Sequence, residues 1–310
     1  MFIYTDKDGN FVKVEGDPDH PITQGRLCPR CLAMGEFLNH PDRIKYPMKR
    51  AKADRGKDKW ERISWDEALD ILETEVRKIW ETYGPEAIYV SKGTGREATE
   101  YAPPMAQAVF KTSNSAQALS GNSCYGPRTV VADYMLGAGY PELDYAAFFP
   151  DRYDDPRYEV PKYIVLWGKD PLFSNPDGFF GHAVVDAMRR GTRLIVIDPR
   201  VTWLASRADI FLQLRAGTDT ALGMAMIDYI IKEDLYDHDF VEYWCYGFEQ
   251  LADRVAEMPA EKAGPICGID PDYIKAAARM YANAKPASLQ WGLAFDQSTN
   301  GMQMSHCAIA

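Results

Sequence analysis

Two short apolar runs separated by a helical stretch constrain the fold of this chain more than any other feature. Tyr163–Trp167 (YIVLW) has the continuous apolar pattern of a strand that is buried on both faces, and residues 194–197 (LIVI) repeat it. Residues 179–190, between them, suit a helix. A strand, a helix and a second buried strand in this order predict a parallel βαβ unit, which we interpret as a Rossmann-like nucleotide-binding domain.

Polar residues and a glycine follow both strands, at the positions where nucleotides bind to parallel sheets. Gly168, Lys169 and Asp170 follow the first strand, and Asp198 and Arg200 follow the second. An acidic side chain at the second strand end can accept hydrogen bonds from a ribose or a purine edge. The glycine-rich fingerprint G-x-G-x-x-G is absent from the sequence, so an ordinary NAD site is not supported and another nucleotide is left open.

The start of a later helix is a second candidate ligand site. Asp219–Lys232 has the amphipathic pattern of a helix, and Gly217 and Thr218 stand immediately before it. Backbone N–H groups at a helix start, the Thr218 hydroxyl and the Asp219 carboxylate suit a phosphate or a guanine. Simple capping of the helix is the alternative interpretation.

The rest of the chain predicts further helices and strands in alternation. Residues 2–5 and 11–14 alternate around a turn and predict a small hairpin. Ser64 and Glu67 form a capping-box pattern at the start of the clearest helix. The remaining expected elements are a helix over 32–38, a surface connection over 39–62, a strand over 87–90, a helix over 97–110, a strand end at 118–121, a long loop and domain boundary over 141–161, a helix over Pro271–Asn283, a strand over 288–291 and a helical stretch at the last residues.

Composition excludes some classes of function. Hydrophobic residues make up 46% of the chain and charged residues 26%, as in ordinary globular domains. The 45 Asp and Glu outnumber the 35 Lys and Arg, and the net charge of -10 argues against a general nucleic-acid binder. No apolar run approaches the roughly 18 residues of a membrane-spanning helix. Six cysteines in 310 residues favour reduced thiols or metal ligands over structural disulfides.

Cys28 and Cys31 are the cysteines closest in sequence, and Arg30 lies between them. A cation beside two thiols favours the thiolate form, which binds metals or exchanges with disulfides. A zinc site would need a second ligand pair, and Cys245 and Cys267 each stand alone. The residues by themselves leave three interpretations open: a metal ligand, a thioredoxin-like dithiol, and two reduced thiols near a turn.

Cys124 lies between a predicted strand end and a predicted helix, in the glycine-containing sequence SGNSCYGPR. Glycines let the backbone approach a ligand closely. A thiolate in such a place is suited to be a nucleophile or a soft metal ligand. An inert packing role is the alternative for a single cysteine.

Taken in order, several stretches of the chain resemble the molybdopterin oxidoreductase family, whose members include dimethyl sulfoxide reductase, formate dehydrogenase, and polysulfide and thiosulfate reductases. The resemblance covers essentially the whole chain, and the ordered series of motifs is far more specific than any single one. These motifs are residues 16–21 (GDPDHP), 25–28 (GRLC), 40–43 (HPDR), 46–50 (YPMKR), 60–69 (WERISWDEAL), 198–200 (DPR) and 216–222 (AGTDTAL).

The resemblance implies a multi-domain α/β fold. A small β-rich iron–sulfur domain is expected at residues 1–60, the first half of a split α/β pterin-binding domain at residues 61–155, and an incomplete Rossmann-like dinucleotide-binding domain at residues 156–310. The implied cofactors are bis-molybdopterin guanine dinucleotide, molybdenum or tungsten, and a 4Fe-4S cluster. The chain is expected to be an N- and C-terminally truncated piece of a catalytic subunit, inactive on its own.

The same resemblance implies roles for individual residues. Cys124 is the implied protein ligand to molybdenum or tungsten, and Cys28 is the implied last of four cluster ligands. Arg30 is implied to assist electron passage between cluster and pterin, whereas Cys31 stands where the family usually has glycine and is not counted as a ligand. The residues implied to contact guanine dinucleotide, pterin or phosphate are Gly168, Lys169, Asp170, Asp198, Arg200, Gly217, Thr218, Asp219, Gly292 and Gln297.

One departure from the family pattern concerns the cluster. Family members carry three cluster cysteines upstream of the position of Cys28, and residues 1–27 contain no cysteine. The ligand set of the cluster is therefore expected to be incomplete in this sequence.

The functional hypothesis is an electron-transferring oxidoreductase that acts on a small-molecule substrate. An iron–sulfur electron-transfer subunit is the expected partner, and membrane association is expected only through partner subunits. The surroundings of Cys124 resemble the polysulfide and thiosulfate reductase, catechol dehydroxylase and acetylene hydratase branches more than the formate dehydrogenases. The alternatives are a non-redox hydratase on the same scaffold and a cofactor-free nucleotide-binding protein that uses Cys28 and Cys31 as a dithiol switch. The sequence leaves the substrate and the compartment, cytoplasmic or exported, open.

Overall fold

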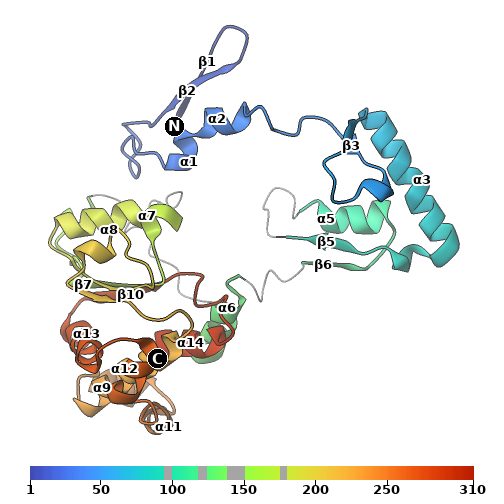
Figure 1. The fold of residues 1–310 in the computed structure, drawn as a ribbon. Coiled ribbons are helices and arrows are strands. Elements are labelled where there is room, and N and C mark those ends of the chain that lie inside the picture. Colours follow the sequence, from blue (N-terminus) through green and yellow to red (C-terminus); the bar gives the residue numbers. More distant parts are fainter. Residues whose placement is uncertain (94–99, 118–123, 138–150, 175–179) are drawn as a thin grey trace. The chain divides into compact units, whose positions relative to one another are not determined.

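The computed structural model describes residues 1–93, 100–117, 124–137, 151–174 and 180–310 (Figure 1). The chain divides into two units. Met1–Leu32 and Gly121–Ala310 form the first unit, and Ala33–Ser120 form the second. None of the helices in the described ranges has the length and apolarity of a membrane span.

A four-stranded parallel sheet forms the centre of the first unit. Its strands lie in the order β10 (Ala287–Trp291), β7 (Tyr163–Trp167), β8 (Arg193–Ile197) and β9 (Ile210–Leu212). β7 pairs in parallel with β8 on one side and with β10 on the other, and β8 pairs in parallel with β9. The strands expected over 163–167, 194–197 and 288–291 are confirmed, and β9 is a strand that the sequence analysis did not predict.

The side chains of β7 and β8 alternate between two apolar cores. On one face, Leu166 and Val196 pack against α8 (Phe180–Arg189). On the other face lie α9 (Asp219–Lys232), α12 (Ala260–Cys267) and α13 (Pro271–Asn283), and Figure 1 shows α8 and these three helices on opposite sides of the sheet. Because successive residues of a strand point to opposite faces, strands covered on both faces must be apolar throughout, which explains the unbroken apolar runs.

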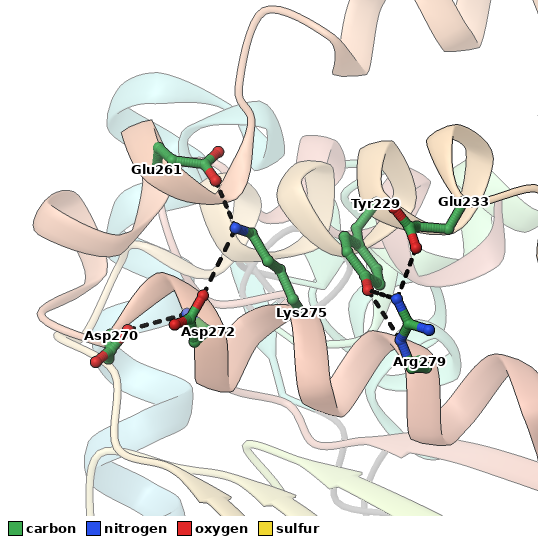
Figure 2. Close-up of polar contacts among 7 residues, drawn as sticks. All are labelled: Tyr229, Glu233, Glu261, Asp270, Asp272, Lys275 and Arg279. Atoms are coloured by element: carbon green, nitrogen blue, oxygen red, sulfur yellow. Dashed lines mark hydrogen bonds and ion pairs between the residues drawn. The ribbon is translucent and has the colours of Figure 1, made fainter.

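Polar contacts join α13 to its neighbouring helices (Figure 2). Lys275 Nζ of α13 lies 2.6 Å from Glu261 Oε1 of α12. Arg279 donates from Nε to the Tyr229 hydroxyl of α9 at 2.9 Å, and its terminal nitrogen NH2 lies 2.6 Å from Glu233 Oε2. Exposed ion pairs add little stability in water, so the apolar core beneath holds these helices against the sheet.

The N-terminal part of the first unit is a hairpin followed by a short helix. β1 (Phe2–Thr5) and β2 (Phe11–Glu15) pair antiparallel, as expected. The single helix expected over 32–38 is instead two short helices, α1 (Pro29–Leu32) at the end of this part and α2 (Met34–Leu38) at the start of the second unit. Proline is well tolerated in the first turn of a helix, which allows α1 to begin at Pro29.

The second unit contains the predicted capped helix. α3 (Trp65–Tyr83) begins after Ser64, whose Oγ accepts a hydrogen bond from the Glu67 backbone N–H at 3.0 Å. Lys49 Nζ lies 2.5 Å from Glu67 Oε1, so the Glu67 carboxylate forms an ion pair with a lysine of a neighbouring strand. That strand, β3 (Met48–Lys49), pairs antiparallel with β4 (Glu61–Arg62) within the stretch that was expected to be only a surface connection.

The other elements of the second unit depart from expectation around prolines. The strand expected over 87–90 begins later, because a 3-10 turn occupies Pro85–Ala87, and β5 (Val90–Lys92) then pairs in parallel with β6 (Ser115–Gln117). In place of a continuous helix to residue 110, the described chain has α5 (Ala102–Pro104) and a π-helical turn over Met105–Val109. Consecutive prolines remove backbone donors and interrupt a regular helix. The expected helix start at 97, the strand end at 118–121, the part of the long loop at 141–150 and residue 179 lie outside the described residues.

Candidate functional site

The loops after the four parallel strands carry all the residues expected to contact the nucleotide. Parallel strands end at the same edge of a sheet, so these loops share one edge. They are Gly168, Lys169 and Asp170 after β7, Asp198 and Arg200 after β8, Gly217, Thr218 and Asp219 after β9, and Gly292 and Gln297 after β10.

The loops after β7 and β10 touch at the point where the strand order reverses. The chain runs outward from β7 through β8 to β9 and then returns to place β10 on the other side of β7. Gly292 N donates to the Trp167 carbonyl at 3.0 Å, and Gly168, with φ +56°, donates from its N–H to the Ile197 carbonyl at 2.7 Å. A Cβ on Gly292 would lie 2.0 Å from the Gly168 carbonyl oxygen, so the two backbones can meet only without a side chain. Ligands of open parallel sheets bind at such a reversal point.

Asp170 provides a buried acceptor beside that point. Its side chain is 7% exposed, and Oδ1 has no hydrogen-bond partner among the described residues. Burial raises the pKa of the Asp170 carboxyl, while the Arg200 guanidinium lowers it. Buried polar atoms are nearly always paired in folded proteins, so Oδ1 is suited to accept a hydrogen bond from a ligand.

Asp198 and Arg200 form a fixed turn after β8. Asp198 is 2% exposed, and its Oδ1 accepts the Arg200 backbone N–H at 2.8 Å and Nε at 3.3 Å. The Asp198 carboxylate raises the pKa of the Arg200 guanidinium. The Arg200 side chain is nevertheless 69% exposed, so its remaining donors can reach an anionic ligand such as a phosphate.

The turn before α9 does not use its hydroxyl as a cap. Thr218 Oγ1 donates back to the Arg215 carbonyl at 2.6 Å, and no side-chain cap closes the helix start. Asp219 Oδ1 accepts a hydrogen bond from Trp167 Nε1 at 3.0 Å, and burial raises the pKa of its carboxyl. Gly217 has φ +84° and faces open space. The Thr218 hydroxyl therefore does not cap this helix, although capping was the favoured interpretation of these residues taken by themselves.

Cys124 lies in the turn before α6 (Gly126–Leu136), in the first unit, and is only partly buried. Its sulfur belongs to neither apolar core of the sheet. Arg128, in the first turn of α6, donates from Nε and from a terminal guanidinium nitrogen to Asp296 Oδ2 in the loop after β10. Its guanidinium lies 5.4 Å from the centre of the Trp291 ring. Arg128 also donates its backbone N–H to Asp296 Oδ1 at 2.9 Å. These contacts hold the Cys124 segment beside the loop edge of the sheet.

Arg128, Asp296 and Asn300 are residues that the sequence analysis did not assign to the site. Asp296 is 2% exposed, and its carboxylate is satisfied by Arg128. Asn300 Nδ2 donates to Thr220 Oγ1 at 3.0 Å and links the β10 loop to the start of α9. The only sequence signal was the position of Arg128 in the motif that contains Cys124, because its partner is distant along the chain.

Cys28 and Cys31 lie together in the first unit. Cys28 is 3% exposed, Cys31 is partly exposed, and their sulfurs are 3.5 Å apart. Arg30 is exposed between them. The preceding loop is fixed to α8, because Arg26 NH1 lies 2.6 Å from Asp186 Oδ2.

The thiols do not complete a metal centre by themselves. A 4Fe-4S cluster takes four thiolates, and the cysteines among residues 1–40 are just two, Cys28 and Cys31. Over the described ranges, no group of three or more His, Cys, Asp or Glu side chains is placed to hold a metal ion. Cys267 packs in the core, and burial raises the pKa of its thiol.

The second unit has a hollow that contains none of the predicted site residues. It has a volume of about 490 Å³, and the rings of Tyr46, Trp60 and Trp65 form part of its lining. Arg62 and Arg50 stack on two of these rings, those of Tyr46 and Trp60. These four residues belong to the motifs at residues 46–50 and 60–69 that carry the family resemblance, and the cation–π contacts give those motifs a structural role.

Comparison with known proteins supports the sequence resemblance. Residues 43–307 match the model of the molybdopterin oxidoreductase family, and residues 2–40 match that of the molybdopterin oxidoreductase Fe4S4 domain. The two matches imply a molybdopterin cofactor and a 4Fe-4S cluster, and the relatives are enzymes.

Individual relatives cover the chain almost completely. Acetylene hydratase of Syntrophotalea acetylenica is 36% identical over 297 residues, which are 94% of this chain and 38% of that protein. The probable dimethyl sulfoxide reductase chain YnfF of Escherichia coli (strain K12) is 32% identical over 318 residues, 95% of this chain and 38% of that protein.

A solved structure shows the same architecture. Acetylene hydratase from Pelobacter acetylenicus matches with a TM-score of 0.76 and 33% identity, covering 99% of this chain and 40% of that one. The chain thus spans about two fifths of the length of these relatives. With a family model matched over most of its residues, the chain belongs to the molybdopterin oxidoreductase family.

Proposed function

We propose that this chain is part of the catalytic subunit of a molybdenum or tungsten oxidoreductase that binds bis-molybdopterin guanine dinucleotide. The observation that carries the proposal is the loop edge of the parallel sheet. There the Gly168 and Gly292 backbones meet and Asp170 presents a buried oxygen with no partner among the described residues. When bound, the metal supplies electron-transfer chemistry toward a small-molecule substrate.

The loop residues suit the parts of a guanine dinucleotide. Asp170, Asp198 and Asp219 are buried or half-buried carboxylates that can accept hydrogen bonds from guanine N–H groups or ribose hydroxyls. Arg200 and Lys169 supply positive charge for phosphates. The turn glycines Gly168, Gly217 and Gly292 allow close approach of the backbone, and Thr218 and Gln297 add polar groups beside them.

Cys124 is the proposed protein ligand to the metal. A thiolate is a soft ligand that matches molybdenum or tungsten alongside dithiolene sulfurs. Arg128 and Asp296 would act on Cys124 only by holding its segment next to the β10 loop. In this proposal the substrate binds above Cys124, and its identity is left open.

Electrons would enter through the N-terminal part of the chain. Cys28 is the proposed ligand of a 4Fe-4S cluster, and Arg30 would lie between cluster and pterin. We propose an iron–sulfur subunit as the electron-transfer partner, which is supported by a relative whose name marks it as one chain of a reductase. The proposed domains are residues 1–60, 61–155 and 156–310, the first overlapping the matched Fe4S4 domain.

Metal and nucleotide analysis tests the proposal. The protein would be expressed from its complete reading frame without oxygen and analysed for molybdenum, tungsten and acid-released guanosine monophosphate. We expect about two guanine nucleotides for each metal atom. Cys124→Ala should remove one sulfur neighbour from the metal in X-ray absorption spectra, whereas Cys245→Ala, at an exposed thiol, should not. Protein without either metal or guanine nucleotide, or an unchanged sulfur count in Cys124→Ala, would contradict the proposal.

A hydratase on the same scaffold is the second candidate. The similarity to acetylene hydratase, in both sequence and structure, favours it. Water addition to a triple bond transfers no net electrons, so a hydratase would turn over acetylene to acetaldehyde with the electron acceptor and donor both omitted. Product formation under those conditions would replace the oxidoreductase proposal and leave the cofactor assignment intact.

A further inference from the structure

Cys28 and Cys31 have the geometry of a pair of thiols that can be joined. Their sulfurs lie 3.5 Å apart, and a disulfide bond is about 2.05 Å long. Cys28 immediately precedes the single helical turn α1 and Cys31 lies within it, so side-chain rotation can bring the sulfurs into bonding distance. The loop just before them is fixed by the Arg26–Asp186 ion pair, which keeps Cys28 in place.

The two thiols differ in access, which gives them different roles in an exchange reaction. Cys31 is partly exposed, whereas Cys28 is 3% exposed. An incoming small disulfide therefore reaches the Cys31 sulfur first, and Cys28 is positioned to attack the product.

We propose that Cys28 and Cys31 form a reversible disulfide by exchange with a low-molecular-weight disulfide such as oxidised glutathione. The Cys31 thiolate, its proton lost to solvent, attacks one sulfur of the small disulfide and releases the other as a thiolate. Cys28 then attacks the Cys31 sulfur and displaces the second small thiolate, which takes up the proton that Cys28 loses. The two protein thiols lose two electrons in total, and the small disulfide is reduced to two thiols.

This reaction has a consequence for the cluster, which rests on the proposed function. A sulfur engaged in a disulfide cannot bind iron as a thiolate. Oxidation of the pair therefore removes Cys28 from the cluster ligands, and reduction restores it. Cys31 thus makes cluster assembly depend on the thiol–disulfide state of the surroundings.

Peptide mapping tests the disulfide directly. Trypsin cleaves after Arg26, Arg30 and Arg43, so Cys28 and Cys31 fall on two different peptides, residues 27–30 and 31–43. Protein from the complete reading frame, made under iron limitation, would be equilibrated with oxidised glutathione, blocked with an alkylating agent and digested without reductant. We expect the two peptides to be linked in most molecules and to separate after treatment with dithiothreitol.

Three variants make the result specific. Cys31→Ser should give no linked peptides, and Cys28→Ser should stop at a mixed glutathione disulfide on Cys31. Cys245→Ser, at an exposed cysteine elsewhere, should behave like the wild type. Unlinked peptides in the wild type at equilibrium, or a link from Cys31 to another cysteine, would overturn the proposal.

Iron uptake separates this inference from the proposed function. Reduced and glutathione-oxidised protein would be supplied with ferrous iron and sulfide, and bound iron would be measured. We expect several-fold less iron in the oxidised wild type, with no effect of oxidation on Cys31→Ser. Equal uptake in the presence of the peptide link would remove Cys28 from the cluster ligands. No uptake in either state would count against the proposed cluster, while the peptide result would still decide the disulfide.

Discussion

Removing the Asp296 carboxylate is expected to release the first turn of α6 from the sheet edge. The side chain of Asp296 is fully buried and that of Arg128 is 14% exposed. Three donors of Arg128 bind this carboxylate: the backbone N–H, Nε and a terminal guanidinium nitrogen. Breaking one side of a buried pair costs about 3–5 kcal/mol, because the remaining charge loses its partner. In the variant, the Trp291 ring still contacts the guanidinium and offsets part of this cost, so the expected loss of stability is about 3 kcal/mol.

Hydrogen–deuterium exchange measures this loss where it occurs. A loss of about 3 kcal/mol corresponds to a roughly 100-fold larger opening constant for the affected backbone. Asp296→Ala should therefore speed amide exchange in α6 by about that factor, as well as in α14 (Gly301–Ile309), which packs against it. Exchange in β7 and β8 should change much less, because the cores of these strands do not include Asp296.

A matched carboxylate elsewhere provides the control. Glu257 pairs with Arg254 at 2.5 Å, but both side chains are largely exposed. Glu257→Ala should leave exchange in α6, and in α11 (Phe248–Val255), the helix that carries Arg254, close to the wild type. If α6 exchanged equally fast in Asp296→Ala and the wild type, the pair would not hold the Cys124 segment, and our account of how Cys124 is positioned would be refuted.

Two further predictions concern the loop edge. Gly292→Ala should destabilise the protein by roughly 3 kcal/mol or more in urea unfolding, since its Cβ would lie 2.0 Å from the Gly168 carbonyl oxygen. Gly191→Ala is the control, because this glycine has a positive φ but has open space around it, and the change should cost only about 1–2 kcal/mol. Equal losses of stability in the two variants would contradict the steric argument. Burial raises the pKa of Asp219 above 3.8, so the folded state binds more protons there and its stability falls as pH rises from 3.8 through the folded pKa. Asp219→Asn should flatten that part of the pH profile of unfolding, and an unchanged slope would show that this carboxyl does not titrate as described.

Local patterns were sufficient to predict the long elements with clear periodicity, whereas α10 (His238–Trp244), α11 and α12 were not predicted. The apolar runs of β7 and β8 required strands with both faces covered, and the Ser64 cap fixed the start of α3. β9 escaped prediction because a strand of only three residues, Ile210–Leu212, has no measurable periodicity. Around Pro103 and Pro104, helical spacing of apolar residues suggested a longer helix than the missing backbone donors allow.

Only part of the site could be predicted in the same way. Loop residues such as Asp198 were identifiable because the carboxyl ends of parallel strands meet wherever such a sheet forms. The Arg128–Asp296 pair was not, because its members are 168 residues apart and nothing local marks Asp296 as a partner. The contact between Gly168 and Gly292 likewise depends on β10 pairing with β7, which no short window of sequence contains.

The strand order also affects how the chain emerges from the ribosome. β7 is made before β8 and β9, but its other neighbour, β10, is synthesised only after the whole helical segment that follows β9. Until then, β7 has one unpaired edge of apolar residues in a parallel sheet, a type of structure that folds slowly and exposes surface to aggregation. Productive folding in the cell is therefore expected to depend on chaperones that protect the nascent chain during that interval.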